Sequence, residues 1–416
     1  MFASYSRLDL NIVVGPEKPS HIKTTLSSNL PILIDYSTRL DGPPREITAS
    51  ALWRMRAALR RRDRVREISF GWWVVDFIRK FIATTNHHFP ALESLVLCFP
   101  VGQEPDIPAT FLRGPNQSNL PLRRLKLYNC SLTSVSGLLL SATALTDLTL
   151  NLNIPPNFAA FNSSQESILV TRLQGMQCLR SLNLTTPYYL SGSESQHSTP
   201  QNIVPLLTLT HFHYSGPTLF LNNLMSKLSA PSLQDVRFVL STGSPFLYLT
   251  RVIDDLREEF RSIRVNFDMG CFRLLSSTQS GKIDHSKPSF SFNVNYFPYS
   301  ISAINSTPST KLAMVEDLAL NFPSSKMTIW ENVFSLREFL RQFRSVKVLR
   351  VNPFPFMQEL GLYLQQDDGE PILPLLEEIE LSDEEYQRRV AEAVAALEPF
   401  ASARERAGRL VKVYSC

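Results

Sequence analysis

The amino-acid sequence predicts an α/β protein built as a solenoid, a horseshoe with parallel strands on its concave face and helices on its convex face. Two observations lead to this prediction. A spacing of large apolar residues that is typical of a short strand returns about every 28 residues along most of the chain. Several segments between these strands carry apolar residues at helical spacing. Because one strand and one helix cannot bury their own apolar faces, neighbouring units must pack against one another.

The strand pattern is clearest in the segment LRRLKLYNCSL, residues 122–132. Leucines at positions 122, 125, 127 and 132, with Cys130 before the last of them, reproduce the spacing L-x-x-L-x-L-x-x-C-x-L of a leucine-rich repeat. In such a motif a short strand is followed by a turn that a cysteine or an asparagine closes. Its first three apolar positions recur at Val65, Ile68 and Phe70; Leu92, Leu95 and Leu97; Leu145, Leu148 and Leu150; Leu179, Leu182 and Leu184; Leu209, Phe212 and Tyr214; Leu233, Val236 and Phe238; Phe260, Ile263 and Val265; Val315, Leu318 and Leu320; Val346, Leu349 and Val351; and Leu376, Ile379 and Leu381, with a weaker strand at Phe290, Phe292 and Val294.

The connecting segments include four with a helical pattern, namely residues 71–84, 221–228, 247–260 and 330–343. Strand and helix therefore alternate along the chain. Neighbouring strands stand about 4.8 Å apart whereas packed helices need about 10 Å. A stack of such units must curve with its strands on the inside, and this mismatch predicts the horseshoe.

We expect one continuous solenoid with three parts: an N-terminal capping region over residues 1–60, leucine-rich repeats over 61–382, and a C-terminal helix and last strand over 383–416. In the first part, LDLNIVV and LPILIDY are predicted strands and residues 47–62 a helix. Near the other end, Ser382 and Glu385 form a capping box that begins a helix. The polar, Ser-rich segments 190–202 and 277–289 are interpreted as exposed connections.

The composition excludes several classes of protein. In 416 residues, 44% are apolar, and 42 Lys and Arg against 38 Asp and Glu leave a charge of +4, too balanced for nucleic acid as the chief partner. Five cysteines without a C-x-x-C pair fit neither a disulfide framework nor a zinc site and favour a reducing compartment. No signal peptide or membrane-spanning run is visible. We therefore expect an intracellular protein, cytoplasmic or nuclear, that binds neither nucleic acid nor membrane.

The strand residues on either side of the inward apolar pair should line the concave face, because side chains alternate along a strand. These residues are polar and mixed in sign, which suits recognition of a protein, with Tyr and Arg as the best anchors by residue type. For any single position, the alternative interpretation is an ordinary solvated strand residue. The predicted protein-binding residues are Arg124, Lys126, Tyr128, Asn151, Asn183, His211, His213, Asp235, Arg237, Arg264 and Arg350.

Two groups of residues on this face could carry chemistry. Ser181, His211 and Asp235 occupy equivalent positions of successive strands, a nominal nucleophile, base and orienting acid, so a hydrolase is the alternative function of another class. Nothing Gly-rich lies nearby to form an oxyanion hole. His211 and His213 could instead hold a metal with Asp235, but a further ligand is missing. The chain has no Gly-rich phosphate loop, H-E-x-x-H or G-x-S-x-G motif, and we expect no catalytic residue, cofactor or metal.

The phrases PALESLVL, LRRLKLYNCSL, ATALTDLTL and CLRSLNLTT resemble the leucine-rich regions of fungal F-box proteins, and the resemblance extends from about residue 8 onward. It implies a non-catalytic protein-protein recognition module, similar to the substrate-binding part of an F-box subunit of a cullin-type ubiquitin ligase. Near the N-terminus no L-P-x-E is followed by helically spaced Ile and Leu. A cullin-ligase adaptor is therefore an expected partner only if an F-box lies outside this chain or is degenerate. The alternative is a free-standing leucine-rich-repeat scaffold without a ligase connection.

Overall fold

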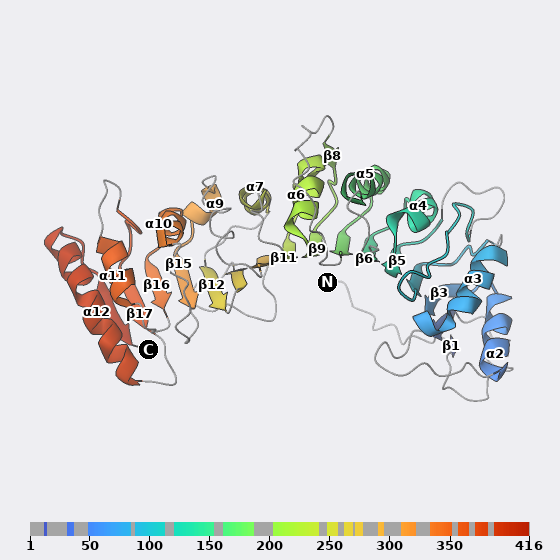
Figure 1. The fold of residues 1–416 in the computed structure, drawn as a ribbon, viewed down its shortest axis with the longest axis horizontal. Helices are drawn as coiled ribbons and strands as arrows, with labels where there is room; N and C mark the ends of the chain where they lie inside the picture. Colours follow the sequence, from blue (N-terminus) through green and yellow to red (C-terminus); the bar gives the residue numbers. More distant parts are fainter. Residues whose placement is uncertain are drawn as a thin grey trace, which may run out of the picture. The chain divides into compact units, whose positions relative to one another are not determined.

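The structure is a computed structural model of the chain, and it contains two compact units, residues 1–209 and 210–416. Both units are α/β, with strands that run mainly parallel and helices in the connections (Figure 1). The residues that the structure describes are 12–14, 31–36, 49–84, 88–112, 120–153, 161–186, 203–240, 248–256, 262–268, 271–277, 290–294, 309–321, 333–351, 357–365, 371–381 and 387–415.

The first unit has a parallel sheet whose strands lie side by side in the order of the sequence. A further short strand, β8 (Val204–Pro205), lies near the end of the unit. The strands are β1 (Ile12–Val14), β2 (Ile32–Tyr36), β3 (Val65–Phe70), β4 (Ser94–Cys98), β5 (Arg124–Cys130), β6 (Asp147–Leu152) and β7 (Ser181–Thr185), and the helices are α2 (Ala49–Leu59), the 3-10 turn η1 (Trp72–Val74), α3 (Val75–Thr84), α4 (Leu132–Ser141) and α5 (Phe161–Gln174).

The apolar positions of each motif face the helices. Along β6 the side chains alternate between half-buried and buried, and Leu148 is only 1% exposed. Figure 1 shows α4 and α5 on the same side of β5 and β6. Ser131 caps the N-terminus of helix α4, and its hydroxyl group accepts a hydrogen bond from the Ser134 amide at 3.2 Å. Packing of the strand leucines against these helices therefore builds the core of the unit.

The second unit is also mainly parallel, with helices between most of its strands. Its longest helix, α12, packs against α11 and against β17 and β18. The elements are β9 (His211–Gly216), α6 (Thr218–Lys227), β10 (Leu228–Ser229), β11 (Asp235–Leu240), α7 (Leu249–Asp255), β12 (Ser262–Asp268), β13 (Cys271–Ser277), β14 (Phe290–Val294), α9 (Thr310–Ala313), β15 (Asp317–Asn321), α10 (Val333–Arg341), β16 (Val348–Val351), α11 (Met357–Gln365), β17 (Glu378–Leu381), α12 (Gln387–Arg406) and β18 (Lys412–Ser415).

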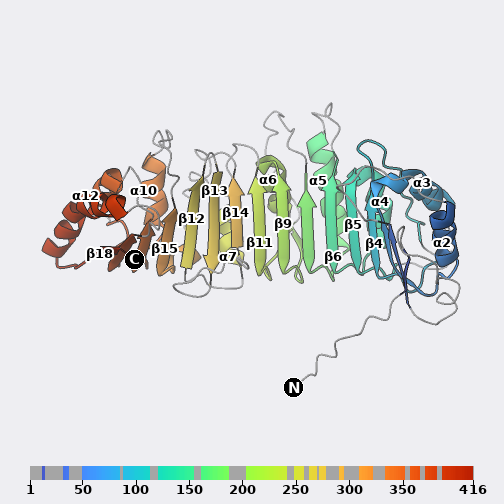
Figure 2. The ribbon, with the colours of Figure 1, turned by 90° about the horizontal axis from the view of Figure 1, so that it is seen from below.

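The strand order of the second unit departs from the simple succession that the repeat predicts. Its sheet runs β9-β11-β14-β13-β12-β15-β16-β17-β18, and β13 is antiparallel to both of its neighbours. The cause is a hairpin, because β12 and β13 pair from Asp268 and Cys271 back to Ser262 and Ser277. The chain then returns as β14, which lies next to β11. Figure 2 shows β11, β14, β13 and β12 as neighbouring arrows.

Most of the predicted elements are confirmed. Every predicted repeat strand is a strand, and within each unit these strands run parallel to one another. The two predicted N-terminal strands, the helix that follows them and the C-terminal helix and strand are present as β1, β2, α2, α12 and β18. The capping box at Ser382 and Glu385 and the connection 190–202 lie outside the described residues, as does 278–289 of the second connection; Ser277 belongs to β13.

Candidate protein-binding face

We use the term outward face for the strand positions that alternate with the buried apolar positions of each motif. On β5 these are Arg124, Lys126 and Tyr128, which are exposed or half-buried, whereas Leu125 and Leu127 between them are fully buried. The period-two geometry of a strand explains this division. The predicted outward positions of the first unit therefore share one side of its sheet.

The strand register places four predicted binding residues of the first unit close together. Lys126 lies opposite Thr149 on β6, and Thr149 lies opposite Asn183 on β7. One step further along the strands, Tyr128 lies opposite Asn151. Side chains directly opposite each other on neighbouring strands are about 5 Å apart at Cβ, so Lys126, Tyr128, Asn151 and Asn183 form one continuous patch.

Arg124 belongs to a different row of the same face. Its Nη2 atom lies 3.9 Å from a carboxylate oxygen of Glu67, and the Arg124 side chain is 54% exposed. Strand β4 lies between the strands of these two residues, with Ser94 opposite both of them. The ion pair therefore passes over Ser94, which is 5% exposed. An exposed pair at this distance is weak, so Glu67 neutralises the guanidinium only in part.

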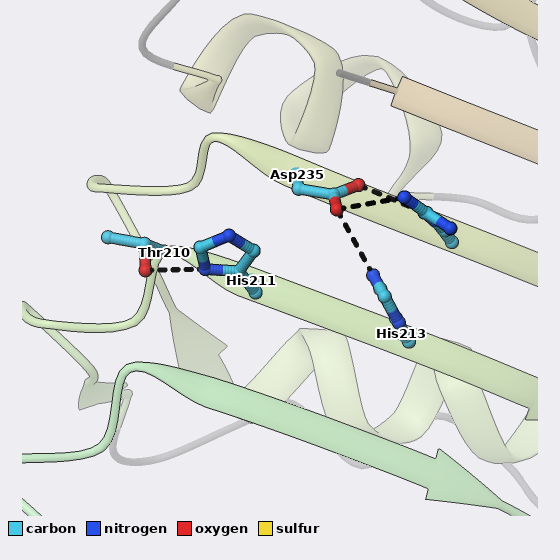
Figure 3. Close-up of polar contacts among 5 residues, drawn as sticks. Thr210, His211, His213 and Asp235 are labelled. Carbon is cyan, nitrogen blue, oxygen red and sulfur yellow. Dashed lines mark hydrogen bonds and ion pairs between the residues drawn. The ribbon is translucent and has the colours of Figure 1, made fainter. Parts of the chain in front are cut away.

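In the second unit, His213, Asp235 and Arg237 make direct contacts (Figure 3). The Nε2 atom of His213 lies 3.4 Å from Oδ2 of Asp235. The Arg237 guanidinium donates to both carboxylate oxygens at 3.3 Å. In register, however, Asp235 lies opposite His211 and Arg237 opposite His213. The His213–Asp235 contact therefore crosses the two strands diagonally.

This arrangement changes the acidity of Asp235. Burial acts to raise the pKa of the Asp235 carboxyl group, but hydrogen bonds from His213 and Arg237, together with their charges, outweigh burial and lower the pKa below its ordinary value. His211 is exposed, and its Nδ1 atom lies 2.8 Å from the hydroxyl oxygen of Thr210. Asp235 is thus held as a carboxylate by its partners on the outward face.

The groups that suggested chemistry are arranged differently from the sequence-based alternative. Asp235 contacts His213, whereas the nominal hydrolase arrangement requires a contact with His211. Ser181 lies on β7 of the other unit. Within the described ranges, no three His, Cys, Asp or Glu side chains are grouped so as to hold a metal ion. Burial raises the pKa of the thiols of Cys98 and Cys130, which favours the protonated and less nucleophilic form.

Arg350 is the centre of a second polar cluster of the second unit. Its guanidinium donates to Glu380, directly opposite on β17, at 2.5 Å, and to Asp317, diagonally placed on β15. The hydroxyl group of Tyr414 on β18 lies 2.9 Å from carboxylate oxygens of both Glu378 and Glu380. Four neighbouring strands are thus joined by side chains of the outward face.

Burial and neighbouring carboxylates both affect the pKa values of Arg350 and Tyr414 in this cluster. Burial acts to lower the pKa of Arg350, but the hydrogen bonds and charges of Asp317 and Glu380 outweigh it and raise the pKa. The hydrogen bond to Glu380, burial and the hydrogen bond to Glu378 raise the pKa of the Tyr414 hydroxyl group. Sequence reasoning placed Arg350 on this face but missed Tyr414. Applying the motif spacing to the last predicted strand, which is β18, would have placed Tyr414 on the outward face as well.

The last predicted binding residue is Arg264. It lies on β12, opposite Ala319 on β15 and Leu275 on β13, next to the buried Ile263. The side chain of Arg264 lies outside the described part of the structure, as does that of Asn266. The register therefore places Arg264 on the strand without assigning it a contact.

Comparison of the chain with models of protein families found no match, and comparison with curated proteins found no significant match. Within the described residues, no helix has the length and apolarity needed to cross a membrane. The function is therefore inferred from the outward face itself.

Proposed function

We propose that the chain is a leucine-rich-repeat solenoid that binds another protein with its outward face. The observation that supports this most is the row of parallel strands with buried leucines on one side and polar, accessible side chains on the other. Parallel sheets in α/β proteins are usually covered on both faces and carry apolar residues on both. A parallel sheet with a polar face is expected where that face meets water or a partner, as in solenoid repeats.

The chemistry of the face favours a protein over other ligands. Arg124, Lys126 and Tyr128 stand beside hydroxyl and amide side chains, and the second unit adds paired acids and bases. Mixed charge with a few Tyr and Arg anchors is the composition of a protein-protein interface. A nucleic-acid surface would instead carry an excess of cations over carboxylates.

The cellular role within this proposal is recognition of substrates for a cullin-type ubiquitin ligase. It is supported by the resemblance of phrases such as LRRLKLYNCSL to the leucine-rich regions of fungal F-box proteins. The ligase adaptor would bind through an F-box outside or degenerate within this chain. The corresponding compartment is the cytoplasm or the nucleus. A free-standing scaffold is the alternative within the same class of binding proteins.

Affinity purification of the full chain from its native cells tests this function. The variant Thr149→Arg places a bulky cation in the middle of the outward face of the first unit, where Thr149 is half-buried. Its matched control, Thr171→Arg, makes the same change on the exposed side of α5. We expect Thr149→Arg to lose partners that the wild type and Thr171→Arg retain.

The identity of the retained proteins then separates the two roles. Recovery of a cullin-ligase adaptor supports the substrate-recognition role. Face-dependent partners without an adaptor support the scaffold. If Thr149→Arg retains the same proteins as the wild type, the outward face of the first unit is not the binding surface.

A further inference from the structure

The cations of the outward face differ in how far the chain itself neutralises them. Arg237 donates to both oxygens of Asp235, and Arg350 is paired with both Asp317 and Glu380. These arginines were predicted as anchors, but their charges are already compensated within the chain. A partner carboxylate at either arginine would have to compete with a carboxylate that is already bound.

Lys126 is the contrasting case. Its side chain is exposed, and it makes no ion pair or hydrogen bond with any residue in the described ranges. Arg124 is the other cation of β5. Its guanidinium group forms a weak ion pair with Glu67 at 3.9 Å, and Arg124 lies opposite Asp147 on β6. The ammonium group of Lys126 is therefore the charge on this part of the face that is most available to a partner.

The neighbours of Lys126 carry no negative charge, and all of them except Val96 have a side chain that can donate a hydrogen bond. The aligned positions from β4 to β7 in the rows of Lys126 and Tyr128 hold no carboxylate. Burial, with a smaller effect of Cys98, raises the pKa of the Tyr128 hydroxyl group, so this group keeps its proton and can donate at neutral pH. These neighbours are Val96, Thr149 and Asn183 in the row of Lys126, and Cys98, Asn151 and Thr185 in the row of Tyr128.

We propose that Lys126, together with the hydroxyl group of Tyr128 and the side-chain amide of Asn151, receives a carboxylate from an acidic side chain of the partner protein. An ammonium group and neutral donors around one position are the groups that bind a carboxylate by charge-assisted hydrogen bonds. Glu67 and Asp147 in the adjacent row repel a second negative charge, so they direct the acidic side chain toward Lys126. This inference depends on the proposed function and adds the chemistry of the partner.

Carbodiimide coupling tests the contact directly. The reagent activates a carboxyl group, takes up the water that is lost, and leaves an amide bond to an amine in contact with it. The full chain is treated in lysate of its native cells, and the linked peptides are identified by mass spectrometry. We expect a link between the Lys126 nitrogen atom and an Asp or Glu of a protein whose retention Thr149→Arg abolishes.

Three variants separate charge from coupling. Lys126→Gln should lose the link and retain roughly tenfold less of that protein, because the attraction to its carboxylate is removed. Lys126→Arg should no longer form the amide link to the partner, because a guanidinium group does not couple to the activated carboxyl group. It should still retain the partner protein, since the guanidinium group keeps the positive charge. Lys80→Gln, the same change at an exposed position on α3, should alter neither.

Each other outcome has a defined meaning. Retention by Lys126→Gln equal to the wild type, with Thr149→Arg still inactive, overturns the carboxylate contact and leaves the proposed function standing. If the protein is no longer retained after the lysate has been treated with a phosphatase, the carboxylate contact is overturned, because Lys126 then binds a phosphoryl group of the partner. If Thr149→Arg has no effect, the outward face of the first unit is not the binding surface, and the carboxylate contact fails with it.

Discussion

The imidazole of His213 contacts the carboxylate of Asp235 diagonally across β9 and β11, with 3.4 Å between Nε2 and Oδ2. His211, at the directly opposite position, binds Thr210 instead. On a twisted sheet a longer side chain can reach the diagonal neighbour, which is about 7 to 8 Å away at the backbone. The electrostatics of the face therefore depend on pairs that strand alignment alone does not identify.

Asp235 should make the stability of the second unit depend on pH in the acidic range. Its folded-state pKa is lowered, so its stabilisation is complete above the ordinary value of about 3.9 and is lost as the pH falls through the folded-state pKa. We expect Asp235→Asn to cost about 1 kcal/mol of unfolding free energy near neutral pH and less at an acidic pH below about 3.9, where the stabilisation by the carboxylate is being lost. Urea denaturation at both pH values measures this difference. Asp63→Asn, at an exposed position, is the control, and an equal cost at both pH values would contradict the prediction.

Arg350 should contribute far more to the free energy of unfolding than an ordinary surface arginine does. Arg350→Ala removes the guanidinium group that pairs with Asp317, which is 1% exposed. Removing one partner of a buried ion pair costs about 3 kcal/mol because the other charge stays desolvated. The control is Lys347→Ala, which breaks the exposed pair with Glu316 at 3.5 Å and should cost no more than about 0.5 kcal/mol. Chemical denaturation compares the two, and similar costs would show that burial of Asp317 does not matter.

Leu148 tests the packing of the strands against the helices. It is 1% exposed, and its strand pairs with β5 on one side and β7 on the other. Leu148→Ala should destabilise the first unit by about 2 to 5 kcal/mol, since it leaves a cavity in the core. Thr149→Ala, one residue along on the outward face, should cost well under 1 kcal/mol. Thermal unfolding followed by circular dichroism distinguishes the two, and equal shifts would contradict the assignment of faces.

Gly137 should not tolerate a side chain, although it lies within α4. A Cβ atom added there would stand 2.7 Å from the amide nitrogen of Ala109 and 2.8 Å from the carbonyl oxygen of Ile107. Alanine is otherwise favoured over glycine in a helix by about 1 kcal/mol. We expect Gly137→Ala to destabilise the unit by about 1 to 3 kcal/mol because the backbone must move. Gly175→Ala, where the nearest atom is 3.5 Å away, should be tolerated; a stabilised Gly137→Ala would rule out the close approach.

The strands and their buried faces could be predicted because their signal is local. The spacing of Leu122, Leu125 and Leu127 follows from the alternation of side chains within one strand, and the same spacing identified the later strands in turn. The polar outward positions were found by the same reasoning. Helices α4 and α5 were not among the predicted helices, although Ser131 with Leu132 and Val135 provides a start signal for α4.

The insertion of β13 could not be predicted from the repeat, because it depends on which strands meet in space. Residues 271–277 carry no copy of the motif, yet they pair with β12 and β14 and place β14 beside β11. Any segment that adopts an extended conformation can form backbone hydrogen bonds with a neighbouring strand, whatever its side chains. The local pattern therefore does not reveal this rearrangement.

The sequence alone determined that this protein is α/β, where its parallel strands lie, and which side of each strand is apolar, because these properties depend on periodicity within a few residues. Only the tertiary structure decided the strand order around β13, the diagonal pairing of His213 with Asp235, and the neutralisation of Arg237 and Arg350 while Lys126 stays available. Charge compensation depends on distances between residues that are far apart along the chain, and folding alone sets those distances.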